Sequence, residues 1–185
     1  YGKTVFIDSS DNVYIGIYLG YFNSYGSLKK INSSNGNVIW SALAEDNNYR
    51  TLEDATIDSS DNIYITVLGS NFFKNDDNGS IVWTKRGYST SAYGHSVVTD
   101  SSGNAYFAGY TSGSYLGTDL GNKDIFLVKF NSSGSEQWVQ RLGSSQDEQV
   151  WKSDSAIIDS SNNIYLTGWT TGGMDGNAHS GERDI

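Results

Sequence analysis

The sequence contains no cysteine, only two histidines and few basic residues, and these shortages exclude several classes of function. Without cysteine there is no disulfide framework, no thiolate metal site and no cysteine nucleophile, and cysteine usage says nothing about the redox compartment. The 12 basic residues are outnumbered by 21 acidic ones, which gives a net charge of −9. Such a charge disfavours nucleic acid or an anionic membrane as a partner. No apolar run approaches the roughly 20 residues of a membrane-spanning helix, so we expect no membrane span.

The chain begins at Tyr1 without an initiator methionine or a signal peptide, which is typical of a mature or excised segment. Its 185 residues are enough for one domain with a sizeable core. Apolar and aromatic residues are too frequent for a disordered chain. Glycine, serine, asparagine and aspartate are abundant and favour turns, so we expect many short strands joined by tight loops.

A seven-residue motif of the form Asp-Ser-Ser-x-Asn-x-Tyr occurs four times. Its copies begin 42 to 59 residues apart, at Asp8, Asp58, Asp100 and Asp159. A second element, Gly-x-x-x-Trp, lies between consecutive copies and ends at Trp40, Trp83 and Trp138. A recurrence of this length is typical of proteins built from repeated supersecondary units.

Each unit is expected to contain four strands. The first strand ends at the motif aspartate and covers 5–7, 55–57, 97–99 and 156–158 in the four units. The second follows the turn directly and covers 13–18, 63–68, 105–110 and 164–169. The third is clearest at 125–130, and the fourth carries the tryptophan. Because the first two strands are apolar on successive positions, both faces of the sheet should be covered by neighbours.

The turn between these strands has a clear chemical basis. Its aspartate can accept hydrogen bonds from backbone groups two residues further on. Residues that tolerate a positive φ then recur at one position of the turn, namely Asp11, Asp61, Gly103 and Asn162. The motif tyrosines and the tryptophans recur so strictly that we assign them all to packing between units.

Four-stranded antiparallel sheets repeated at this spacing predict an all-β fold, a β-propeller. We expect one domain over residues 1–185, with blades at about 1–50, 51–92 and 93–150 and half a blade at about 151–185. About three and a half blades make an incomplete ring, which exposes a blade face and sheet edges. The remaining blades would come from a longer chain or from a second chain.

Two stretches of the sequence, 100–111 and 123–134, resemble the bacterial SBBP β-propeller repeat. The resemblance implies a secreted protein, placed extracellularly, at the cell surface or in the periplasm, often within a longer chain and usually without a known activity. It supplies no catalytic residues. The stretch 35–40 is also similar to the repeat of quinoprotein propellers but carries no cofactor ligand. An enzyme or quinoprotein fragment is a further alternative, although no cofactor ligand in this stretch supports it.

Two sets of equivalent positions are candidate binding residues. Five residues before each motif aspartate lie polar side chains that we expect at the mouth of the central channel: Lys3, Glu53, His95 and Asp154. Ten residues after it, in three of four units, lie aromatic side chains at the start of the variable loops: Tyr18, Tyr110 and Trp169. Flat rings give a partner a large contact area at a low entropic cost. Each set also has a structural reading, as the lining of a wet channel end or as packing between blades.

The sequence predicts a non-enzymatic binding or scaffold module. It shows no nucleophile–base pair, no phosphate loop and no metal-ligand spacing, and the acidic stretches 75–78 and 175–177 lack the spacing of an EF-hand. We therefore predict no catalytic residue, metal or cofactor. The loops opposite the uniform turns vary in length and chemistry, so a protein partner is expected on that face. A lectin-like propeller that binds a glycan through Tyr110 and Trp169, and a structural subunit of an extracellular assembly, are the alternatives.

Overall fold

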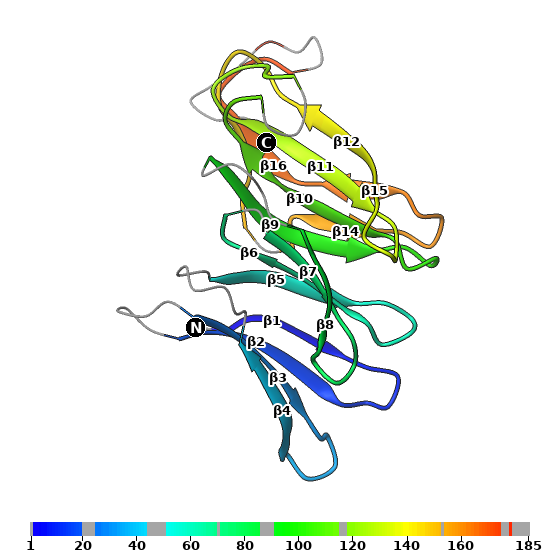
Figure 1. Ribbon diagram of the computed structural model, residues 1–185. Helices are drawn as coiled ribbons and strands as arrows, with labels where there is room; N and C mark the ends of the chain where they lie inside the picture. Colours follow the sequence, from blue (N-terminus) through cyan, green and yellow to red (C-terminus); the bar gives the residue numbers. More distant parts are fainter. Residues whose placement is uncertain are drawn as a thin grey trace.

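The computed structural model describes residues 2–19, 25–43, 51–69, 71–85, 91–114, 118–152, 154–174 and 178, and for residues 18, 19, 25 and 43 the backbone alone. Strands and loops make up this part of the chain (Figure 1). It contains no helix, and therefore none that could cross a membrane.

Three sheets of four antiparallel strands follow one another along the chain, each with its strands in sequence order. The first sheet contains β1 (Gly2–Ile7), β2 (Val13–Leu19), β3 (Tyr25–Ile31) and β4 (Val38–Leu43). The second contains β5 (Leu52–Ile57), β6 (Ile63–Val67), β7 (Asn71–Asn75) and β8 (Ile81–Lys85). The third contains β9 (Ala92–Thr99), β10 (Ala105–Thr111), β11 (Asp124–Phe130) and β12 (Glu136–Leu142). The prediction of an all-β fold of four-stranded blades is confirmed.

The fourth unit consists of four short strands that form two pairs. β13 (Glu148–Val150) pairs with β16 (Gly168–Thr170), and β14 (Ala156–Ile158) pairs with β15 (Ile164–Leu166). We expected one strand over 164–169, but it is interrupted at Thr167, because the inner strand opposite is itself divided into β13 and β14. The inner strand of this unit begins at Glu148, before the expected blade boundary. The blades of the described residues do not form a closed ring.

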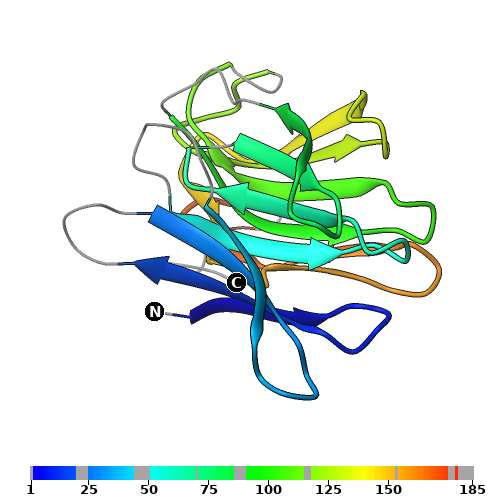
Figure 2. The same cartoon turned by 60° about the horizontal axis from the view of Figure 1, so that its bottom comes forward.

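The inner strands β1, β5, β9 and β14 are successive neighbours, and the sheets stack face to face (Figures 1 and 2). A hydrophobic cluster fills each of the three spaces between neighbouring units. A motif tyrosine contributes to each cluster from the preceding blade; these are Tyr14, Tyr64 and Tyr106, whose exposed fractions are 0%, 0% and 5%. The expected burial of both faces of a blade is thus realised at the internal positions.

The motif aspartate organises its turn as expected. One Asp58 carboxylate oxygen accepts the backbone N–H groups of Ser60 and Asn62 at 2.9 and 3.0 Å. The other accepts the Tyr64 hydroxyl at 3.1 Å, which ties the turn to the core. The turns then place Asp11, Asp61 and Asn162 at φ angles of 62°, 60° and 63°, the left-handed region that aspartate and asparagine tolerate.

Tryptophans on the outer strands connect consecutive blades. The indole N–H of Trp40 donates to the carbonyl of Asp77 at 2.9 Å, and that of Trp83 donates to the carbonyl of Ser132 at 3.2 Å. Each acceptor lies in the turn before the outer strand of the next blade. For Tyr165 and Trp138, the assignment of the motif tyrosines and tryptophans to packing between blades stays a prediction, although Trp138 lies 5.8 Å from the ring of Tyr106 in its own blade. Tyr165 and Trp138 are 52% and 36% exposed, because no described blade covers the fourth unit and no described turn lies beside Trp138.

Substitution of Gly134 should show how tightly these turns pack on the tryptophans. Gly134 has a φ of +81°, and an added Cβ would lie 3.0 Å from the Trp83 ring. Gly36 has a similar φ of +72° and open space around its Cα, so it is a matched control. Both alanine variants should carry the cost of a left-handed backbone, roughly 1–2 kcal/mol. Overpacking should make Gly134→Ala less stable than Gly36→Ala by a further 1–3 kcal/mol or so in urea denaturation. Equal losses would contradict this packing.

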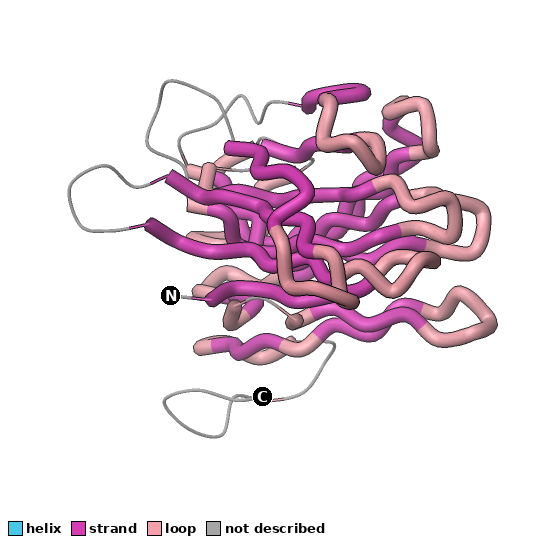
Figure 3. Tube along the Cα trace, turned by 90° about the horizontal axis from the view of Figure 1, so that it is seen from below, coloured by secondary structure: helices cyan, strands magenta, loops and turns pink. Residues whose placement is uncertain are grey.

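The two ends of the strands carry different connections (Figure 3). At one end lie the aspartate turns and the turns at 32–37, 76–80 and 131–135, which we call the turn face. At the other end lie the described loops 112–114, 118–123 and 143–147, which we call the loop face. The first residues of the inner strands point toward the loop face, because these strands end at the aspartate turns.

Candidate functional site

The candidate ring positions are bulged residues of the inner strands. In β1 the register passes from Gly2 to Thr4 while β2 advances by one residue, so Lys3 has no partner opposite. The same shift of register leaves Glu53 in β5 and His95 in β9 without a partner residue on the neighbouring strand. In the fourth unit Asp154 lies in the longer detour opposite Thr167 and has a φ of 63°. A bulge bends the strand and redirects the extra side chain, which is why bulges often occur beside functional sites.

Three of these side chains meet. The ammonium group of Lys3 forms an ion pair with the Glu53 carboxylate at 3.2 Å. Nδ1 of His95 lies 3.7 Å from the same carboxylate, which is too far for a direct hydrogen bond. The side chains of Lys3, Glu53 and His95 are 26%, 11% and 14% exposed, so the group is sheltered without being sealed. We call these three residues, together with Asp154, the bulge ring.

The charges of the ring keep its glutamate ionised. Burial by itself raises the pKa of Glu53, but the neighbouring His95 and Lys3 side chains outweigh it, and the pKa lies below its usual value. The ionised carboxylate can accept hydrogen bonds from a polar partner, and the neighbouring ammonium and imidazole can donate them. The ring therefore presents both charge signs within three neighbouring strands.

Tyr110 joins the two predicted sets of residues. Its ring stacks on Tyr93 at 5.0 Å and on His95 at 5.4 Å between centroids, and the ammonium of Lys123 lies 5.5 Å from its centroid. Burial raises the pKa of the Tyr110 hydroxyl, and the nearby Tyr93 and Glu53 add to the shift. Tyr110 is thus a half-buried neighbour of the bulge ring, and its aromatic ring is already in contact with Tyr93, His95 and Lys123.

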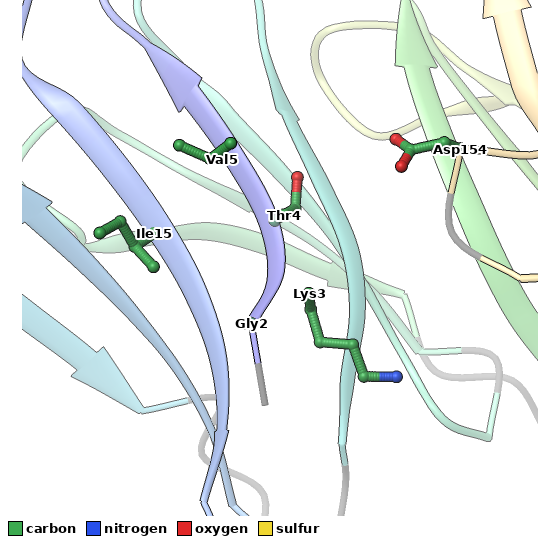
Figure 4. Close-up of a pocket in the computed structure, with 6 residues that line it drawn as sticks. All are labelled: Gly2, Lys3, Thr4, Val5, Ile15 and Asp154. Atoms are coloured by element: carbon green, nitrogen blue, oxygen red, sulfur yellow. The ribbon is translucent and has the colours of Figure 1, made fainter.

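Asp154 and Lys3 border the same cavity, whose volume is about 390 Å³ (Figure 4). The cavity is lined by Gly2, Lys3, Thr4, Val5, Ile15 and Asp154. An exposed acid from the fourth unit and the lysine of the first unit therefore border one space, although 151 positions separate them in the sequence. The structure thus places Lys3 and His95 beside Glu53, and Asp154 on the cavity that Lys3 also borders.

The other two predicted aromatic residues are not part of this group. Tyr18 lies in β2, but its side chain lies outside the described residues. Trp169 is half-buried in β16, where its backbone is paired with that of Gln149 in β13. Their part in binding stays a prediction.

Sequence reasoning missed Asp54, which is the most perturbed carboxyl group beside the ring. It is 3% exposed and accepts hydrogen bonds from Ser96 Oγ and from the backbone N–H of Val97, both at 3.0 Å. Burial raises its pKa from 3.8 to about 6; the hydrogen bonds oppose this rise and the charge of Asp154 adds to it. The other units have small hydroxyl residues at this position, namely Thr4, Ser96 and Ser155. The sequence signal that could have revealed Asp54 is its acidic side chain at a position where the other three units have a hydroxyl residue.

Asp54 should make the protein less stable as the pH rises from about 4 to 6. In the unfolded chain the Asp54 carboxyl group has a pKa of 3.8 and releases its proton in this interval. In the folded chain its pKa is about 6, so it keeps the proton. The folded state thus binds more protons, and its stability falls by an amount on the order of 3 kcal/mol, complete above pH 6. In Asp54→Asn this loss is absent. Urea denaturation of both proteins at pH 4 and pH 7 measures the loss. If the free energy of unfolding changes with pH equally in the wild type and in Asp54→Asn, the assignment is contradicted.

Buried charges also hold the described loops of the loop face. The guanidinium of Arg141 is paired with the fully buried Asp124 and donates to the carbonyl of Gly113 at 2.6 Å. Glu148, also fully buried, accepts the backbone N–H and the hydroxyl of Ser144 at 2.7 and 2.6 Å. These contacts join residues of different strands and loops, and no motif in the sequence marks them. They hold Gly113 and Ser144, two described residues of the loop face, against the neighbouring strands.

The acidic stretches considered for calcium give no support for a site. Asp76 accepts the backbone N–H groups of Asn78 and Ser80 at 3.1 and 2.8 Å, so its carboxylate caps its own turn. The stretch 175–177 lies outside the described residues. Within the described part of the chain, no three histidine, aspartate or glutamate side chains come together as metal ligands.

Comparison with known proteins supports the propeller fold. The family model of the β-propeller repeat SBBP matches residues 82–116, which confirms the resemblance. No curated protein matches the sequence. A protein of unknown function from Bacteroides caccae matches with a TM-score of 0.56 and 11% identity, over 80% of this chain and 47% of that one. The extracellular domain of a putative hybrid two-component system from B. thetaiotaomicron matches with a TM-score of 0.52 and 16% identity.

The second match covers 91% of this chain and 20% of that domain. The chain therefore spans less than half the length of either structure. At these identities the likeness concerns the fold alone.

Proposed function

Because the chain carries an SBBP β-propeller repeat, we propose that it is a non-enzymatic binding module that holds a protein partner on its loop face. The observation that carries the proposal is the bulge ring. Bulges at equivalent positions of three strands place a lysine and a histidine beside a glutamate, and the equivalent aspartate of the fourth unit borders the same cavity as the lysine. Specific recognition requires a rigid scaffold whose equivalent positions carry different side chains, and the bulge ring has this property.

Two further features support a protein partner. The Arg141–Asp124 pair and Glu148 hold the described loop residues Gly113 and Ser144, which lowers the entropy that these residues lose on binding. The ring also offers both charge signs, which suits a polar protein surface. Glycan stacking has less support, because Tyr93 and His95 already stack on Tyr110.

The extracellular neighbour and the repeat family favour a place outside the cytoplasm, in the periplasm or at the cell surface.

Site-specific photo-crosslinking tests this function. A photoreactive phenylalanine replaces Asp119, an exposed residue of the loop face, or Ser133, an exposed residue of the turn face. Each protein is illuminated with the secreted and surface material of the source bacterium, and products are identified by mass spectrometry. We expect one defined protein crosslinked through position 119 and not through position 133. No product, or the same products from both positions, would overturn the proposal.

A further inference from the structure

Asp54 connects two neighbouring bulges of the ring. It follows the bulged Glu53 in β5, and its carboxylate accepts hydrogen bonds from the two residues that follow the bulged His95 in β9. Ser96 donates through its hydroxyl and Val97 through its backbone N–H, each over 3.0 Å. Both contacts cross from the second blade to the third, beside the point where Glu53 and His95 approach each other. They hold the bulge of β9 against the bulge of β5.

The corresponding contacts between the other units involve neutral groups. Thr4 and Ser96 occupy the position of Asp54 in the first and third blades. Thr4 donates its hydroxyl to the carbonyl of Ala55 at 3.2 Å, and the Ser96 hydroxyl oxygen accepts the backbone N–H of Ala156 at 3.2 Å. Of these three contacts, the one that joins the second blade to the third is therefore the one that depends on a group able to gain or lose a proton.

The buried hydroxyl of Thr66 has no hydrogen-bond partner in the described part of the chain. Thr66 is fully buried in β6, directly opposite Asp54 in the pairing of β5 with β6. Side chains at opposite positions of two strands lie close together on one face of the sheet. The hydroxyl also lies against Gly94, because an added Cβ there would overlap with its oxygen. A buried hydroxyl without a partner is costly, and a protonated carboxyl group at Asp54 can supply the missing hydrogen bond.

The charges near Asp54 favour its neutral form. Lys3 and His95 face Glu53, and the charge of Asp154 in the fourth unit opposes ionisation of Asp54. The groups of β6 and β9 that meet Asp54 are uncharged. Burial raises the pKa of Asp54 to about 6, although its hydrogen bonds oppose the rise. A carboxyl group with this pKa changes its state between mildly acidic and neutral solution.

We propose that Asp54 is a positioning residue of the bulge ring and acts as a proton-controlled latch between β5 and β9. In its ionised form the carboxylate holds the two residues after His95, and Glu53 faces His95 as described. In its neutral form the carboxyl group donates to Thr66, and its contact with β9 weakens, because a neutral acceptor forms weaker hydrogen bonds than a charged one. The ring is therefore held at neutral pH and loosened in mild acid.

Nuclear magnetic resonance of the whole chain tests the latch without any partner. The amide proton of Val97, which donates to the carboxylate, should shift with pH in one step with a midpoint of about 6. In Asp54→Asn this step should be absent, although His95 is still present. In Thr66→Val, which removes the acceptor of the proton, the midpoint should fall by roughly half a pH unit or more, about a threefold loss of proton affinity. Thr56→Val, two residues beyond Asp54 in β5, is the control and should leave the midpoint unchanged.

Three results would overturn the latch. The first is a Val97 signal that does not change between pH 4 and pH 7. The second is a step that remains in Asp54→Asn, since it would then come from His95. The third is a midpoint that Thr66→Val leaves unchanged, because the neutral form would then not donate to Thr66.

The consequence for binding, which rests on the proposed function, is measured separately. For the protein identified by photo-crosslinking, the dissociation constant of the wild-type chain should be about tenfold higher at pH 5 than at pH 7. In Asp54→Ser, which has the hydroxyl side chain of other units, this ratio should be several-fold smaller. Equal ratios in the two proteins would overturn the control of binding by Asp54. The Val97 step does not depend on any partner, so failure of the latch and failure of the proposed function are distinguishable.

Discussion

Replacing Arg141 by methionine is expected to lower the free energy of unfolding by about 3–5 kcal/mol, because it leaves the Asp124 carboxylate buried without its cation. The Arg141 side chain is 4% exposed and that of Asp124 is 0% exposed, so water cannot take the place of the guanidinium. The substitution also removes the donors to the Gly113 carbonyl and the Asp119 carboxylate. Denaturation in urea measures the loss, and limited proteolysis should show faster cleavage in the loop before β11.

The double variant Arg141→Met with Asp124→Leu is the control for this prediction. Removing both charges relieves the uncompensated carboxylate, and apolar replacements of a buried ion pair are often neutral or stabilising. The double variant should therefore recover most of the stability lost in the single variant. If the single variant is as stable as the wild type, or the double variant is less stable than the single one, the pair does not hold the loop as described.

Truncating Tyr64 to alanine should destabilise the protein by a similar amount, about 3–5 kcal/mol. Its ring is fully buried between the second and third blades and lies edge-on to Trp83 at 6.0 Å. Its hydroxyl donates to the Asp58 carboxylate within its own unit and lies 2.9 Å from the carbonyl of Gly103 in the next. The residue therefore joins a turn, a core and the neighbouring blade.

The conservative variant Tyr64→Phe separates these contributions. It keeps the ring and removes only the hydroxyl, so Asp58 and Gly103 lose a buried partner at a cost of about 1–3 kcal/mol. We expect thermal and urea denaturation to rank the proteins as wild type, Tyr64→Phe and Tyr64→Ala in falling stability. Equal stability of the alanine variant and the wild type would contradict the interface between the blades.

The local features of the fold could be predicted from the sequence because short-range chemistry determines them. A turn with a positive φ needs a residue such as Asp11 or Asn162, and the repeat made that position visible four times. The burial of Tyr14, Tyr64 and Tyr106 followed from the same recurrence. Tyr165 differs because burial depends on the neighbouring blade, which the motif itself does not contain.

The site could be predicted in position but not in geometry. A constant interval of five residues placed Lys3, Glu53 and His95 at equivalent points of their strands. That these points are bulges depends on pairing register, which single-strand patterns do not reveal. The raised pKa of Asp54 and the Arg141–Asp124 pair depend on residues brought together by tertiary packing, so no sequence interval indicated them.

The affinity of the photo-crosslinked partner for a ring variant tests the central claim most directly. The double variant Lys3→Met with Glu53→Gln removes the ion pair of the bulge ring and keeps the size of both side chains. Ser133→Ala, on the turn face, is the matched control, and thermal denaturation establishes that both variants are folded. We predict that the dissociation constant rises about tenfold or more for the ring variant and stays within about twofold of the wild-type value for the control. A folded ring variant that binds the partner as tightly as the wild type would contradict the account.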